Sequence, residues 1–179
     1  MLFIRNCFDP DKIVLAFDGE SLRGVDFSGY NLKEADLTDH DLIGTKFIGS
    51  NLEEANFSRS VLDRAIFDKS IMSETQFSES KLRKASFRSI VAPVTNFGKA
   101  DMRDVDFTDA DIDSSNLADA NAEDCIFVRT KFGKAILWKT NFKNADLTNA
   151  DTRSIESDGL VGTNFEKAVL TGTSLEKKS

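Results

Sequence analysis

The sequence predicts a repeat protein whose coils stack into a solenoid, and two regularities in its 179 residues support that prediction. From Leu22 to Leu147 a large apolar residue returns at every fifth position, with alanine in its place only at Ala92 and Ala122. A mostly small residue, such as Ala35, stands two positions before each of them. A period of five fits neither the α-helix nor the β-strand, so it indicates a repeat architecture.

Residues 1–16 lie outside this pattern, and we expect them to form an N-terminal cap. The run Asp9-Pro10-Asp11 is typical of a turn, and Ile13-Val14-Leu15 is typical of a strand. The core of a stacked solenoid is open at both ends. Its terminal units must therefore differ from the repeat in order to cover those ends.

The repeat array is expected to run over residues 17–152 and then to break. Residues 153–159 interrupt it and are rich in turn-forming side chains such as Ser154, Ser157 and Gly159. The pattern resumes at Leu160, three residues out of step, so residues 160–179 are expected to form a final coil and a C-terminal tail. We expect the extra residues to leave the stack as a small loop near a corner.

Several repeat units share one motif: Ala35-Asp36-Leu37-Thr38-Asp39, Ala55-Asn56-Phe57-Ser58-Arg59 and Ala145-Asp146-Leu147-Thr148-Asn149. They resemble the pentapeptide-repeat family, whose consensus is A(D/N)LXX. The resemblance covers most of the chain, and its motif is highly specific. It implies an all-β fold, a right-handed quadrilateral parallel β-helix of about eight coils with about 20 residues in each.

Residues spaced by one such coil support this period independently. Opposite charges stacked about 4.8 Å apart attract each other, and one outward column alternates in sign: Asp39, Arg59, Glu79, Lys99, Asp119, Lys139. Neighbouring columns pair Lys81 with Asp101, Asp109 with Arg129, Asp111 with Lys131 and Glu123 with Lys143. One inward column is phenylalanine alone: Phe27, Phe47, Phe67, Phe87, Phe107, Phe127. The exceptions include a column of like charges: Glu34, Glu54, Glu74.

Composition excludes several classes of function and location. The net charge of −7 argues against direct nucleic-acid binding, which favours a basic surface. The two cysteines form no CxxC pair, so neither a disulfide framework nor a zinc site is expected. No apolar run is long enough to span a membrane. No signal peptide is visible, so we expect a cytoplasmic protein, with secretion by a signal-peptide-independent route left open.

The sequence predicts no catalytic residue, no metal site and no cofactor. The acidic stretch 109–113 resembles the start of a calcium loop, but Ser114 replaces the required glycine and Ala120 the required glutamate. His40 has no nucleophile motif beside it, and a structural role is expected. Cys125 falls on a small inward position and is expected to be a buried packing thiol. We therefore do not expect an enzyme.

Three sets of residues are candidates for binding another protein. Exposed apolar side chains often mark a binding surface, and loops on rigid scaffolds often carry recognition. Each set also has a structural interpretation. The two patches would then be apolar surface without a binding role, and the loop would be a joint that seats the last coil. The candidates are a first patch of Ile71, Val91, Pro93 and Val94, a second patch of Ile136 and Trp138, and a loop of Ile155, Glu156, Ser157 and Asp158.

The leading functional hypothesis is a non-enzymatic interaction or scaffold module that binds another protein, with a possible homodimer through an end coil. The family resemblance also suggests a DNA mimic that binds and protects DNA gyrase, as in quinolone-resistance members. Duplex DNA carries one charge per ~1.7 Å, and a net charge of −7 with interleaved Lys and Arg lies far below that density. A secreted effector that acts in a host cell is the other alternative.

Overall fold

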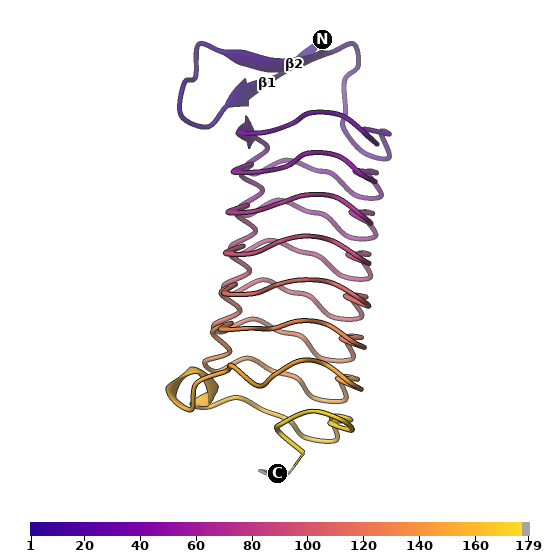
Figure 1. Ribbon diagram of the computed structural model, residues 1–179. Helices are drawn as coiled ribbons and strands as arrows, with labels where there is room; N and C mark the ends of the chain where they lie inside the picture. The colour runs from indigo at the N-terminus through magenta and orange to yellow at the C-terminus, as the bar shows by residue number, and fades with distance from the viewer. Residues whose placement is uncertain (177–179) are drawn as a thin grey trace.

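The computed structural model describes residues 1–176, which form one long stack of coils between a hairpin and the C-terminal end (Figure 1). Residues 177–179, the end of the expected tail, lie outside the described residues. No helix within residues 1–176 has the length and apolar character needed to cross a bilayer.

Isolated parallel bridges build the stack. Asp26 bridges Lys46, and every fifth residue after Asp26 repeats this pairing with the residue 20 positions later, as far as Lys131 and Asp151. Each coil therefore has four sides of five residues. This is the four-sided parallel β-helix that the repeat motif implies.

The corners between sides use left-handed backbone. Most sides have a residue with φ near +60° close to their end, for example Glu54 (φ 58°) and Lys99 (φ 59°). This conformation costs a residue other than glycine about 1–2 kcal/mol. The cost is distributed along the whole stack, so the buried core has to offset it.

The predicted phenylalanine column is confirmed and forms the centre of the core. Phe67 is fully buried, and its ring stacks on Phe47 at 5.0 Å and on Phe87 at 4.6 Å. A second column meets the first edge to face, with Phe57 and Phe77 at 5.7 and 5.4 Å from the ring of Phe67. Stacked and edge-to-face contacts are both favourable for aromatic rings, so the two columns lock the coils together.

The small inward positions carry polar groups that satisfy the backbone. The hydroxyl of Thr140 donates to the carbonyl of Leu117 in the preceding coil at 2.7 Å. The predicted packing thiol is confirmed, because Cys125 is 1% exposed and donates to the carbonyl of Met102. Burial raises the pKa of this thiol far above its ordinary value, so it stays protonated and unreactive.

The N-terminal cap is a hairpin that extends the first coils. Strand β1 (Leu2–Asn6) pairs antiparallel with β2 (Ile13–Phe17) on one edge and with β3 (Ala35–Asp36) on the other. The ring of Phe17 lies 5.9 Å from Phe27 and so covers the end of the aromatic column.

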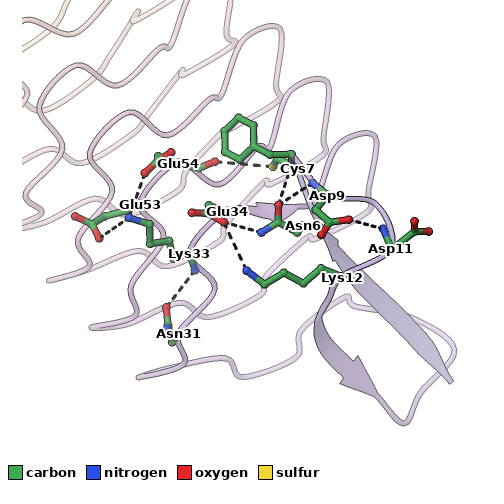
Figure 2. A network of polar contacts seen from close by, with 11 residues as sticks. Asn6, Cys7, Asp9, Asp11, Lys12, Asn31, Lys33, Glu34, Glu53 and Glu54 are labelled. Carbon is green, nitrogen blue, oxygen red and sulfur yellow. Dashed lines mark hydrogen bonds and ion pairs between the residues drawn. The ribbon is translucent and has the colours of Figure 1, made fainter.

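Polar contacts fasten the cap to the array (Figure 2). The Asn6 amide donates to Glu34 at 2.7 Å, while its oxygen accepts the backbone N–H groups of the following turn. Lys12 lies 3.8 Å from Glu34, and Lys33 lies 3.1 Å from Glu54. Lysines outside the predicted column thus neutralise two of its stacked glutamates.

Four of the predicted ion pairs between coils are confirmed: Asp39–Arg59 at 2.7 Å, Asp109–Arg129 at 2.6 Å, Asp111–Lys131 at 3.4 Å and Glu123–Lys143 at 3.9 Å. Two predictions are corrected. In the alternating column only the first pair forms, because within residues 1–176 no ion pair includes Glu79, Lys99, Asp119 or Lys139. The carboxylate of Asp101 was expected to face Lys81, but it binds the guanidinium groups of Arg83 and Arg103 at 2.9 and 2.7 Å. The planar arginine side chains reach it from the neighbouring column and suit a carboxylate better than an ammonium does.

Candidate protein-binding groove

The register break lies near the C-terminal end of the stack. Lys131 pairs with Asp151 at a spacing of 20, whereas Asn141 pairs with Asn164 at a spacing of 23. Three residues have therefore been inserted between these two bridges.

The inserted residues are Glu156, Ser157 and Asp158. Ile155 still fills an inward position, because it is 7% exposed and belongs to the hydrophobic core. The N–H of Leu137 then donates to the carbonyl of Gly159 at 3.0 Å, so Gly159 takes the place that residue 156 would hold in an uninterrupted coil. The expectation that Ile155 belongs to an exposed loop is wrong, since its backbone stays in register and buries the side chain.

The insertion forms a short bulge on the outside of the stack, visible near the yellow end of the chain in Figure 1. A single 3-10 turn, η1 (Asp158–Leu160), returns the chain to the coil. All three inserted residues are exposed.

The bulge and the second predicted patch line one surface groove. Ile136 is 48% exposed and Trp138 is 39% exposed on the coil that precedes the insertion. Together with Glu156, Asp158 and Gly159 they line a cavity of about 500 Å³, which Lys134 and Ala135 complete. The structure thus brings together two of the three candidate sets that the sequence indicated separately.

A reversed turn forms the N-terminal side of the groove. Gly133 has φ +51°, whereas the preceding coil has its positive φ one position later in the turn, at Ser114 (φ 57°). The N–H of Lys134 donates to the Asp113 carboxylate at 3.0 Å. The equivalent N–H of Val94 donates to a backbone carbonyl at 2.9 Å. The Asp113 carboxylate occupies the space where a Cβ on residue 133 would lie, so a larger residue there would have to displace that carboxylate from the Lys134 N–H.

Sequence reasoning missed Asp113, Gly133 and Lys134. The sequence carried no clear signal, because Gly98 holds the same repeat position in a turn whose positive φ stays at the usual place, Lys99 (φ 59°). The hydrogen bonds of Asp113 lower the pKa of its carboxyl, the Lys134 N–H first and the Ser114 hydroxyl next, so it is ionised at neutral pH.

The first patch stays apart from the groove. Ile71, Val91 and Val94 are 47%, 49% and 55% exposed, and the bridge from Ile71 to Val91 aligns two of them. Val91 bridges Asp111, so charged residues separate this patch from the coil that carries the groove. Pro93 lies in the turn beside Val94, which is held at φ 60°.

The remaining polar candidates are structural. Nδ1 of His40 lies 2.8 Å from the carbonyl oxygen of Thr38, and its backbone N–H donates to Ser60. Within the part of the chain that the structure describes, no group of three or more acidic, His or Cys residues could hold a metal ion.

Family comparisons identify the repeat. The model of the pentapeptide repeat region matches residues 41–117 and 60–135, and the model of pentapeptide repeats in eight copies matches residues 21–49 and 125–151. The chain belongs to the pentapeptide-repeat family. No curated protein matches this pentapeptide-repeat chain.

Two solved structures are similar to this chain. A trypsin-treated form of QnrB1, a plasmid-mediated fluoroquinolone resistance protein, is 23% identical, with 89% of this chain and 80% of that one covered and a TM-score of 0.49. HetL from Nostoc sp. strain PCC 7120, involved in heterocyst differentiation regulation, is 19% identical over 86% and 88%, with a TM-score of 0.31.

Proposed function

We propose that this pentapeptide-repeat protein is a non-enzymatic protein-interaction module whose recognition surface is the groove beside Trp138. One observation carries the proposal: the single tryptophan of the chain is exposed and lines a groove with Ile136, next to an insertion that departs from the repeat. Tryptophan is enriched among the residues that dominate binding energy at protein interfaces. An exposed aromatic side chain beside a loop on a rigid scaffold fits that role.

The rest of the solenoid serves as the scaffold. We take it to be right-handed, because parallel strands are joined by right-handed crossovers in nearly all proteins, and to comprise about eight coils. Bridges on all four sides hold the coil that carries Trp138 to the preceding coil, and bridges on three sides hold it to the last coil. The groove is therefore presented without the entropy cost of ordering a flexible surface.

A DNA mimic is the weaker alternative. Mimicry of duplex DNA needs uncompensated charge at about one per 1.7 Å of axis. Asp39 and Asp109 are instead neutralised by arginines of the next coil, Arg59 and Arg129. Such pairs lower the uncompensated negative charge of the stack, which already has a net charge of only −7, further below the charge density of DNA.

Affinity capture from an extract of the native host tests the proposal. The immobilised wild type is compared with an Ile136→Ser, Trp138→Ser double variant. The matched control is Ile48→Ser with Ile126→Ser, which removes two apolar side chains of similar exposure (37% and 40%) from a different side of the coil. We expect the wild type and the control to retain the same partner and the groove variant to lose it.

Equal capture by all three proteins would rule out the groove as the recognition surface. A Val91→Ser, Val94→Ser variant would then test whether the first patch carries the interaction. We expect each variant to keep the wild-type fold, because the substituted side chains are all exposed. Circular dichroism spectra of the variants check this.

A further inference from the structure

We infer that the groove binds a cationic apolar segment of a partner protein, with a large apolar side chain against Ile136 and Trp138 and an adjacent Lys or Arg at Glu156 and Asp158. This inference rests on the proposed function and adds the chemistry of the occupant. It follows from the charges around the groove, from its size and from the way in which the repeat is modified there.

Two lysines lie at or beside the groove: Lys134 lines it, and Lys139 lies next to Trp138. Lys139 Nζ lies 4.0 Å from the centre of the Trp138 ring, in a cation–π contact that occupies one face of the ring. The backbone N–H of Lys134 donates to the Asp113 carboxylate, and its side-chain charge contributes to lowering the pKa of that carboxyl, after the hydrogen bonds. Among residues 1–176, the Lys134 ammonium takes part in no ion pair, so it contributes one positive charge to the groove.

The two acids of the groove are not compensated. Among residues 1–176, neither Glu156 nor Asp158 takes part in an ion pair, and Asp158 accepts a hydrogen bond from the N–H of Gly159 at 2.9 Å. The cation nearest to them in sequence, Arg153, is held by Asp151 at 2.7 Å. The lining residues Glu156, Asp158 and Lys134 carry −1, −1 and +1, a net charge of −1 beside an apolar surface, which is complementary to a segment that is both cationic and apolar.

The size of the groove favours a segment over a folded surface. A cavity of about 500 Å³ has room for a few side chains and falls in the range of ligand pockets. A large apolar side chain seated at Trp138 would displace water, and the acids at the edge would then interact with a neighbouring cation in a less solvated setting. The apolar contact anchors the segment, and the charges select its sequence.

Two independent departures from the repeat meet at this groove. The reversed turn at Gly133 leads directly into Lys134, which lines the groove, and the inserted residues Glu156 and Asp158 line it from the other coil. A joint that only seats the last coil would not need two acidic residues, or a modified turn in the preceding coil. A binding groove accounts for both changes.

Peptide selection tests the inference directly. A phage library of random ten-residue peptides is selected on the immobilised wild type, and enriched peptides are synthesised without tryptophan. Binding is followed by the fluorescence of Trp138, which is the only tryptophan in the chain and lies in the groove. We expect enriched sequences to place a large apolar residue next to Lys or Arg, and to change the Trp138 emission.

Charge reversal provides the decisive comparison. Glu156→Lys with Asp158→Lys should weaken these peptides at least tenfold. The matched control is Asp18→Lys with Glu20→Lys, which makes the same charge change at the same spacing near the N-terminal cap and should leave the affinity unchanged. Selection of acidic or uncharged peptides, or equal affinity for both reversed variants, would overturn the inference, as would failure to enrich any peptide.

The outcomes separate this inference from the proposed function. If a host partner depends on Trp138 but binds the Glu156→Lys, Asp158→Lys variant normally, the proposed interaction function is retained and the inference of a cationic segment is rejected. If the partner also binds equally well without Trp138, the groove is rejected as the recognition surface.

Discussion

At the scale of single residues, Val94 shows that the repeat tolerates backbone strain. It is a β-branched residue at φ 60°, a conformation in which such side chains are rare. Val94→Asn is expected to stabilise the protein by about 1 kcal/mol, because asparagine adopts this conformation more readily. Val91→Asn is the control, since Val91 lies in the same patch on a bridging residue. Urea unfolding would contradict the argument if both variants shifted the midpoint equally.

The aromatic column contains residues whose substitution should lower the stability of the protein. Phe67 is fully buried and contacts four other phenylalanine rings. Phe67→Ala is expected to lower the free energy of unfolding by ~3–5 kcal/mol, because it removes these contacts and leaves a cavity. Phe8→Ala, at a side chain that is 70% exposed, should change it by less than about 0.5 kcal/mol. Similar thermal melts for the two variants would show that the column is not the main source of stability.

At the scale of one side of a coil, the pair Asp151–Arg153 predicts a pH dependence. Arg153 donates two hydrogen bonds to Asp151, at 2.9 and 2.7 Å, and these lower the pKa of the carboxyl to about 2. The pKa of an aspartate in an unfolded chain is about 3.9. As the pH falls, the Asp151 carboxylate is therefore protonated in the unfolded chain before it is protonated in the folded protein. The stabilisation is therefore complete above the pKa of the unfolded chain and is lost as the pH falls towards 2.

Asp151→Asn should remove this contribution. The difference in melting temperature between wild type and variant is expected to be small, since both side chains are partly exposed, and to be constant from about pH 5 to 7. It should shrink as the pH falls from 4 to 2. Arg153→Gln should reproduce the same profile, because it removes the other half of the pair. A difference that grows in acid would contradict the assignment.

The five-residue pattern made the regular sides predictable, because it determines which side chains point inward and which residues stack. The phenylalanine column and the pairs Asp39–Arg59 and Asp109–Arg129 follow from it alone. The turn at Gly133 could not be predicted, since its direction depends on a carboxylate in the coil above. The partners of Asp101 depend on how far the flexible side chains of Arg83 and Arg103 reach, and the sequence pattern does not specify that distance.

The position of the insertion was predictable only to within a residue. Thr152 is small where the pattern expects a large side chain, and Ile155 is large where it expects a small one, although both are buried. A similar exchange occurs at Ile90 and Ala92, where it conserves core volume without any change of register. The sequence pattern alone therefore cannot separate a displaced core residue from the start of a loop.

At the scale of the whole molecule, each coil contacts only its neighbours, so the last coil is held to the stack through the coil that carries the groove. Deleting residues 156–158 should join Ile155 to Gly159 and return every later residue to the regular spacing. Gly162, at φ 74°, would then fall at the usual left-handed corner position. We expect this variant to fold with a free energy of unfolding within about 1 kcal/mol of the wild type, because the removed residues are exposed.

Deleting residues 155–157 removes the same number of residues but moves Asp158 into the inward position of Ile155. Loss of the buried isoleucine alone costs ~2–5 kcal/mol, and an unpaired carboxyl in the core adds a further penalty. This variant should therefore release the last coil, which limited proteolysis would detect as cleavage after residue 152 while the rest of the stack stays protected. If the two deletions were equally stable, Ile155 would not be the last residue in register, and the groove would have to be rebuilt around a different insertion.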